Sequence, residues 1–171
     1  RGWAHGLNRE YSDFSDESSW TTDIGLAGHV DLTRSVLFEA GYGAAELVES
    51  RATAGAASIA AKPVEYNTTN WWIGGQADLG RTRLLLRHDK SNFNFDDAAL
   101  IGGGFADQDF RDRDETIFTI RGDYAVSPFT SVFARYRKNE RDYDLAPPTV
   151  PNNRDSEGYM FDVGADFDIG G

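Results

Sequence analysis

The chain has 171 residues, of which 40% are hydrophobic and 13% are aromatic, so it is long enough and apolar enough to fold as one domain. Its formal net charge of −11 argues against a nucleic-acid partner, because phosphate binding needs a concentrated basic surface and no basic stripe is visible. The absence of cysteine excludes disulfides, thiolate metal sites and thiol nucleophiles, and the 18 glycines favour a β-rich chain with many turns.

The first predicted elements are a strand of mixed polarity at residues 2–12 and a hairpin. A tight turn at Asp31–Ser35 joins two runs, 24–32 and 36–42, in which apolar and polar residues alternate. Successive side chains of a strand point to opposite faces, so each run has one apolar face and one polar face.

Two further hairpins follow at a nearly constant interval, with turns at Asp78–Thr82 and Val126–Thr130. The runs on both sides of each turn alternate in the same way. A fixed period of about 20–50 residues indicates a repeated unit, and here that unit is a hairpin.

The last run, residues 159–169, alternates throughout. One parity is wholly apolar, whereas the other carries Asp162, Gly164, Asp166 and Asp168. With this run, the chain predicts about eight strands, and roughly 9–11 tilted residues suffice for a strand to cross a membrane.

The connections on the other side are long and polar and span residues 12–19, 51–65, 96–115 and 145–157. Short turns at one rim and long loops at the other are typical of bacterial outer-membrane barrels, in which the long loops are extracellular. We therefore predict an all-β fold: an antiparallel up-and-down transmembrane β-barrel in the outer membrane. Three aromatic residues are expected near the loop ends of their strands and one near a turn, where interfacial girdles lie: Trp20, Trp71, Tyr159 and Phe129.

The alternation divides the strand residues into two sets. The apolar set is expected to face lipid: Ile24, Leu26, Val30, Phe38, Tyr42, Trp71, Ile73, Leu84, Leu86, Phe118, Ile120, Tyr124, Val132, Tyr136, Phe161, Val163 and Phe167. The polar set is expected to line the lumen: Asp23, His29, Asp31, Glu39, Arg83, Arg87, Asp89, Arg121, Asp123, Arg135, Arg137, Asp162, Asp166 and Asp168. In a narrow barrel these charges would pair and serve structure, whereas in a wide one they would line a hydrated passage and set its selectivity.

No constellation in the sequence points to catalysis or to a metal. His5, His29 and His88 share no metal-ligand spacing. The acidic residues between Asp96 and Glu115 could bind calcium, but they lack the turn glycine of an EF-hand loop, so a solvated run of charges is the favoured interpretation. We expect no catalytic residue, no bound metal, no cofactor and no enzymatic activity.

From Asp107 onward the chain resembles the putative beta-barrel porin type 2 family of bacterial outer-membrane proteins. The resemblance rests on four segments: Asp109–Glu115, Gly122–Phe129, Tyr136–Asp144, and Arg154–Tyr159 leading into the last strand. It implies a lipid-embedded barrel without a cofactor, often associated with exopolysaccharide or capsule export. Members are usually longer and continue after the Asp-Phe-Asp strand into further hairpins. We therefore expect residues 1–171 to be a single barrel domain that is part of a longer barrel.

Two function classes follow. The leading hypothesis is a non-enzymatic, porin-like barrel that assists passage of a hydrophilic polymer such as exopolysaccharide, or of small solutes. Trp72 and Phe133, on the polar parity, could stack against sugar rings or pack among lumen side chains. The alternative is a structural barrel that holds a partner in the outer membrane, such as an electron-conduit cytochrome or an export lipoprotein.

The remaining alternatives are an outer-membrane enzyme, which would need a convergent Ser/His or Asp/His set, and a soluble ligand-binding β-barrel. Expected partners are outer-membrane lipid or lipopolysaccharide and a polysaccharide or its export machinery. No nucleic-acid partner is expected. The sequence does not decide whether the protein forms an oligomer.

Overall fold

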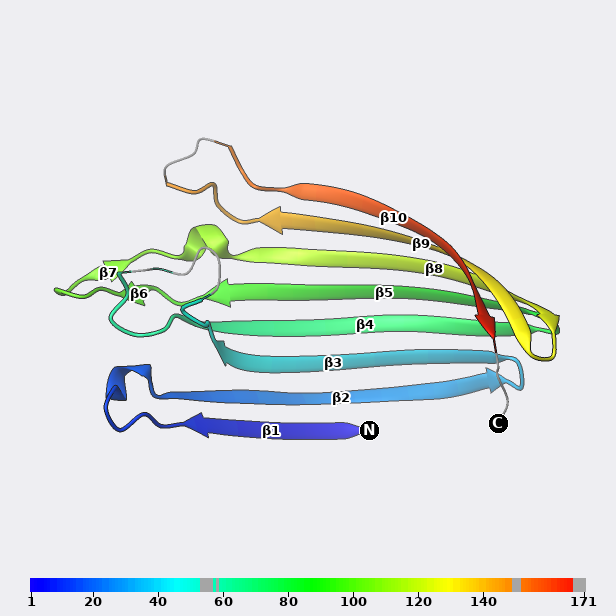
Figure 1. The fold of residues 1–171 in the computed structure, drawn as a ribbon, viewed down its shortest axis with the longest axis horizontal. Coiled ribbons are helices and arrows are strands. Elements are labelled where there is room, and N and C mark those ends of the chain that lie inside the picture. Colours follow the sequence, from blue (N-terminus) through cyan, green and yellow to red (C-terminus); the bar gives the residue numbers. More distant parts are fainter. Residues whose placement is uncertain (53–56, 58, 149–151, 168–171) are drawn as a thin grey trace.

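The computed structural model describes residues 1–52, 57, 59–148 and 152–167. Eight long strands form one antiparallel sheet in the order β1-β2-β3-β4-β5-β8-β9-β10. Figure 1 shows β1 and β10 at opposite edges of the sheet. The strands are β1 Gly2–Arg9, β2 Ser19–Thr33, β3 Val36–Val48, β4 Glu65–Leu79, β5 Thr82–Phe95, β6 Ala98–Ala99, β7 Phe105–Ala106, β8 Arg113–Ser127, β9 Thr130–Tyr143 and β10 Ser156–Phe167.

This topology confirms the predicted all-β, antiparallel, up-and-down fold. Each long strand pairs with the long strand before and after it in the chain. The sheet is open in the described part of the chain, where β1 pairs with β2 and β10 with β9. That residues 1–171 form one domain of a longer barrel stays a prediction.

The three tight turns lie where the sequence predicts them, and they are built in two ways. In the β4–β5 turn, Gly80 has φ +68, a conformation that a side chain would strain. The β2–β3 and β8–β9 hairpins instead shift register by one residue beside the turn, between Asp31 and Thr33 and between Ala125 and Ser127. Such bulges let a hairpin close without a glycine at the turn.

The strands extend further toward the loops than the apolar runs do. Pairing of β4 with β5 continues to Tyr66 opposite Phe95, so β4 begins six residues before Trp71. The expectation that Trp71 lies near the loop end of its strand is therefore wrong. Backbone pairing needs no apolar side chain and continues wherever a partner strand is present.

The loop end of the sheet carries the small elements and the buried core. The two 3₁₀ turns are η1, Ser15–Glu17, and η2, Asp109–Arg111, and Figure 1 shows β6 and β7 at the same end. The buried apolar residues described are Ala60, Val64, Phe95 and Ala98. Within the described residues, no helix combines the length and apolarity of a membrane span.

No second layer packs against the sheet in the described residues. Large apolar side chains on one face stay exposed, for example Leu26 at 67%, Phe161 at 68% and Val163 at 70%. A soluble domain buries such a face against another element, and contiguous exposed apolar surface indicates an interaction with another apolar phase.

Candidate functional site

The register sorts the strand residues onto two faces, named here the polar face and the apolar face. Cross-strand partners share a face, and the pairs place every described residue of the predicted lumen set on the polar face. Asp168 lies outside the described residues. The predicted lipid set lies together on the apolar face. That the polar face lines a lumen and the apolar face meets lipid stays a prediction.

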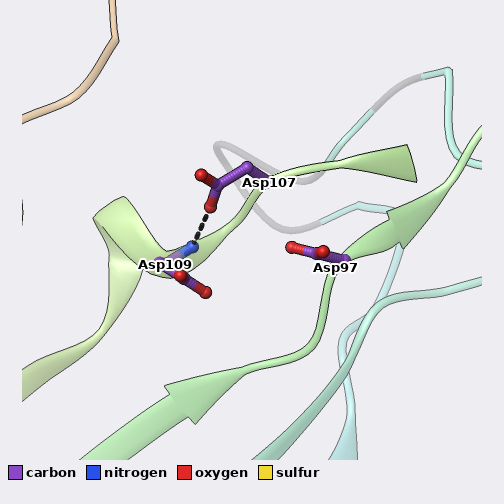
Figure 2. A group of neighbouring side chains, drawn as sticks. All are labelled: Asp97, Asp107 and Asp109. Carbon is purple, nitrogen blue, oxygen red and sulfur yellow. Dashed lines mark hydrogen bonds between the residues drawn. The ribbon is translucent and has the colours of Figure 1, made fainter. Parts of the chain in front are cut away.

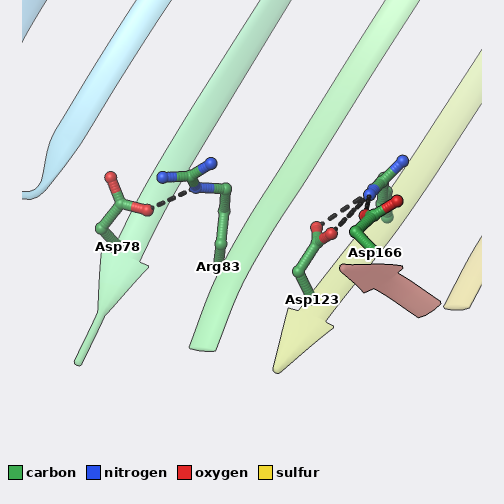
Figure 3. Close-up of polar contacts among 5 residues, drawn as sticks. Asp78, Arg83, Asp123 and Asp166 are labelled. Atoms are coloured by element: carbon green, nitrogen blue, oxygen red, sulfur yellow. Dashed lines mark hydrogen bonds and ion pairs between the residues drawn. The ribbon is translucent and has the colours of Figure 1, made fainter. Parts of the chain in front are cut away.

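At the turn end of the polar face, charges from four strands form ion pairs. Arg83 Nε lies 2.7 Å from Asp78 Oδ1, and Arg121 Nη2 lies 2.6 Å from Asp123 Oδ1 and 3.0 Å from Asp166 Oδ2. Figure 3 shows the aspartates of β4, β8 and β10 turned toward these guanidinium groups. Asp78 is a polar-face acid that the predicted set did not include.

The middle of the polar face holds a second network, which crosses β4 at Gly74 and includes a contact of the Arg87 guanidinium with the Trp72 ring, 5.2 Å from its centroid. Glu39, Gly74 and Arg87 lie in one register row on β3, β4 and β5. Because Gly74 has no side chain, Arg87 Nη1 reaches Glu39 Oε1 at 3.2 Å, and its Nη2 lies 2.8 Å from Asp89. Residues far apart in the sequence thus form one charge cluster.

Arg137 continues the same row on β9, between Thr119 and Met160. Its Nε atom is buried and has no hydrogen-bond partner. No carboxylate among the described residues lies within ion-pair distance of Arg137, whereas Arg135, two residues away, pairs with Asp162 at 2.8 Å. Arg137 therefore leaves its positive charge uncompensated on the polar face.

Arginines gather on three neighbouring strands of the polar face, β5, β8 and β9, although the sequence shows no basic stripe. The group consists of Arg83, Arg87, Arg113, Arg121, Arg135, Arg137 and Arg141. Sequence reasoning missed this concentration because the residues are separated along the chain and only the strand register brings them together.

The polar-face aromatics lie over glycines of neighbouring strands. A Cβ at Gly41 would collide with the ring of Trp72, and one at Gly164 would collide with Phe133. The guanidinium of Arg121 lies 4.1 Å from the Phe133 ring centroid. These rings therefore pack among polar-face side chains, one of the two roles that the sequence left open.

The apolar face has a defined height. On β4 it runs from Leu79 to Trp71 and becomes polar at Thr69, and on β10 it runs from Phe167 to Tyr159 and becomes polar at Glu157. Eight steps along a strand span about 27 Å, or about 20 Å across a membrane at a tilt of about 40°, close to the apolar belt of about 25 Å in outer-membrane barrels.

Charged residues lie at the loop-side edge of this belt on the same face, where Lys90 is paired with Trp71 and Lys138 with Tyr159 across the strands. Lys90 Nζ lies 2.7 Å from Asp114 Oδ2, and Lys138 pairs with Glu140 and, at 3.5 Å, with Glu157. Sequence reasoning did not single out these lysines. The available signal was that each lysine ends a series of alternate apolar residues in its strand.

The loop end is held to the sheet by a nearly buried ion pair between Arg111 and Glu49, named here the clamp. Arg111 of η2 donates two hydrogen bonds to Glu49, the residue after β3, and their side chains are 11% and 6% exposed. A second pair joins Arg51 to Glu17 of η1, and the Arg51 hydrogen bond lowers the pKa of Glu17. These pairs connect loops that are distant in sequence.

Asp112, the residue that follows Arg111, is buried, with a relative exposure of 7%. It accepts hydrogen bonds from the Phe95 backbone N–H at 2.7 Å and from Asn94 Nδ2 at 2.9 Å. Burial raises the pKa of the Asp112 carboxyl, the Phe95 hydrogen bond opposes the rise, and neighbouring carboxylates, of which Asp109 is the foremost, add to it. Ionised Asp112 is thus held in an unfavourable environment.

Three loop acids from the predicted charge run converge. Asp97, Asp107 and Asp109 each place a carboxylate oxygen within 4.8 Å of the others, and all three residues are exposed. Figure 2 shows that Asp107 accepts a hydrogen bond from the backbone N–H of Asp109, at 2.8 Å. This bond organises the start of η2, and exposed acids of this kind fit the solvated interpretation.

On the polar face near the edge of the sheet, the sequence missed one contact between potential catalytic groups. His5 Nδ1 of β1 lies 3.5 Å from Asp23 Oδ2 of β2, and Trp3 Nε1 donates to Asp23 Oδ1 at 3.0 Å. The His5 side chain is 73% exposed. A catalytic role would also need a nucleophile in reach of the imidazole. Among the described residues, no hydroxyl group forms a hydrogen bond with His5, whose ring contacts Asp23.

Comparison with known families accounts for this arrangement. The family model described as putative beta-barrel porin 2 matches residues 4–171. No curated protein and no solved structure matches the chain. The chain belongs to the putative beta-barrel porin 2 family, which agrees with the resemblance in the sequence.

Proposed function

We propose that this member of the putative beta-barrel porin 2 family is a non-enzymatic part of an outer-membrane barrel wall. In this proposal, it assists the passage of a hydrophilic polymer such as exopolysaccharide, or of small hydrophilic solutes. The observation that carries the proposal is the division of a single unlayered sheet into one exposed apolar face and one charged face. A wall between lipid and water needs these two faces.

The apolar face would anchor the wall in the bilayer. Its height is close to that of an outer-membrane belt, as derived above. The lysine–carboxylate pairs of Lys90 and Lys138 lie at the loop-side edge of the belt, where lipid head groups are expected. Lipopolysaccharide is the partner we propose there, because its phosphates can pair with ammonium groups.

The polar face would keep a passing solute hydrated. Its charges are mixed in sign and mostly paired, so they offer water-like hydrogen bonding without strong retention of one ion. Arg137, whose charge is uncompensated among the described residues, would give the passage a local preference for anions.

Two neighbouring residues of β9 provide the test. Arg137→Gln and Lys138→Gln each remove one positive charge, but Arg137 lies on the polar face and Lys138 on the apolar face. A unit charge about 10 Å from a passing ion in water contributes about 0.4 kcal/mol, or about a twofold change in local ion concentration, when salt is low.

We expect Arg137→Gln to lower the anion-to-cation permeability ratio about fourfold in planar bilayers at low salt, because the local anion concentration falls about twofold while the local cation concentration rises about twofold. Lys138→Gln should leave the ratio unchanged. The ratio is obtained from the reversal potential in a salt gradient, and recovery of both variants in the outer-membrane fraction checks insertion. A protein that inserts and conducts no ions, or equal effects of both variants, would refute the passage proposal.

One observation favours the alternative of a scaffold barrel. Most polar-face arginines pair with carboxylates, as they would in an interior filled by side chains or by a partner. Crosslinking in whole cells followed by purification tests this function. A stoichiometric cytochrome or export lipoprotein, together with absent conductance, would favour the scaffold.

A further inference from the structure

The polar face opens into a cleft of about 430 Å³ at its loop end, named here the mouth cleft. Strand residues form its floor, and η2 and the β9–β10 loop contribute walls. A volume of several hundred Å³ suits one small ligand. Its lining residues indicate what it could bind.

Guanidinium groups and aromatic rings alternate around the mouth cleft. Arg111 lies 4.1 Å from the Phe95 ring centroid, and Arg113 lies 4.2 Å from that of Phe93. Arg154 lies 4.5 Å from the ring of Tyr143. Stacking on rings holds each guanidinium plane in place, and the edges of these groups keep donors for a further partner.

The three arginines differ in how much of their charge is already paired. Arg111 is satisfied by nearly buried Glu49, and Arg113 donates through Nε to Glu115 at 2.8 Å. Arg154 donates to the Phe110 carbonyl at 2.7 Å, and no carboxylate of the described residues lies within ion-pair distance of it.

Two other carboxylates near the mouth cleft are taken up by backbone donors. Asp112 accepts from the Phe95 N–H, and Asp155 accepts from the Tyr143 N–H at 2.7 Å. Neither residue lines the cleft. The cleft therefore offers an uncompensated guanidinium at Arg154, beside the aromatic side chain of Tyr143.

We propose that the mouth cleft binds an acidic sugar, with its carboxylate on the guanidinium of Arg154, which lies over the Tyr143 ring, and its pyranose ring against the aromatic lining of the cleft. A carboxylate matches the two parallel donors of a guanidinium, and the C–H face of a pyranose matches an aromatic side chain. The choice of a sugar over other cyclic anions rests on the proposed function. The positive charge and the aromatic lining rest on the geometry of the cleft alone.

The test uses calorimetry to measure the binding of three probes to the full chain folded in detergent. The probes are an oligosaccharide of glucuronic acid, its neutral glucose counterpart, and inorganic phosphate. We expect the acidic oligosaccharide to bind at least tenfold more tightly than the neutral one, and the difference to shrink as salt rises. Phosphate should compete at least tenfold more weakly, because it cannot stack.

Arg154→Gln and Tyr143→Leu should each weaken binding of the acidic oligosaccharide about tenfold, the effect of one charge-assisted hydrogen bond or one stacking contact. The control is Arg34→Gln, which removes the same charge at the β2–β3 turn and should leave binding unchanged. Heat-dependent gel migration of each variant shows whether it is folded.

Equal binding of the acidic and neutral oligosaccharides, or unchanged binding by folded Arg154→Gln, would overturn the proposal. Competition by phosphate as strong as that of the acidic oligosaccharide would also overturn it, in favour of a simple anion site. Ion conductance reports separately on the proposed function. If the protein conducts ions but does not bind the glucuronic acid oligosaccharide, only the proposed sugar binding at the mouth cleft is refuted. If it binds the oligosaccharide but does not conduct ions, the passage proposal is refuted.

Discussion

The clamp between Glu49 and Arg111 leads to a quantitative prediction about the loops. Glu49→Gln keeps the shape of the side chain but removes the charge that compensates nearly buried Arg111. Removing one partner of a buried ion pair costs about 3–5 kcal/mol. Arg111 keeps a hydrogen bond to Gln108 Oε1 at 3.2 Å and its contact with Phe95, so the lower end of that range applies.

A loss of about 3 kcal/mol corresponds to an increase of about 100-fold in the population of opened loops. Limited trypsin digestion of the folded protein measures this opening, because Arg51 lies in the loop that the clamp holds. We expect much faster cleavage after Arg51 in Glu49→Gln. The strands should stay protected, because their pairing does not depend on the clamp.

The matched control is Glu46→Gln, three residues earlier on β3. Glu46 contacts Thr22 at 3.5 Å in an exposed position, so its loss should change cleavage little. Cleavage of Glu49→Gln at the wild-type rate, under conditions where the loops reclose faster than trypsin cuts, would refute the reasoning.

Three further predictions follow from the two faces and the loop end. Leu86→Arg, at mid-height of the apolar face, should destabilise the membrane-inserted protein by about 2–4 kcal/mol, measured by urea unfolding in lipid vesicles. Gly41→Val should cost about 1–3 kcal/mol in the same assay, because the new side chain collides with the indole that lies over this glycine. Because the folded-state pKa of Asp112 is raised, its ionisation lowers the stability of the loop end. The rate of loop cleavage by trypsin, divided at each pH by the rate on an unstructured reference peptide, should therefore rise as pH rises from about 4 through the raised pKa, and Asp112→Asn should remove this dependence.

Each of these variants has a neighbour or a comparison that isolates its cause. Leu85→Arg adds the same charge on the polar face and should cost much less than Leu86→Arg; equal costs would contradict the assignment of the faces. Gly28→Val, where a Cβ meets nothing within 4 Å, should be tolerated; equal loss at Gly28 and Gly41 would mean that crowding is not the cause. An unchanged pH profile in Asp112→Asn would show that another group controls the loop end.

The sequence determines the strands and their faces, because both depend on a period of two. Parity alone places Phe161 and Asp162 on opposite faces, and a slip of one residue would turn every apolar side chain to the wrong face. The turn at Gly80 is equally local, because its positive φ is a property of one residue. These features need no information from distant parts of the chain.

The tertiary structure alone decides which charges meet and where the mouth cleft forms. Arg87 pairs with Glu39 across 48 positions of sequence, and Arg111 pairs with Glu49 across 62. The cluster of arginines on β5, β8 and β9 likewise depends on the strand register. Parity tells which face a side chain occupies, but the partner across a strand depends on register and on the loops. Both are set by long-range pairing, which no local pattern contains.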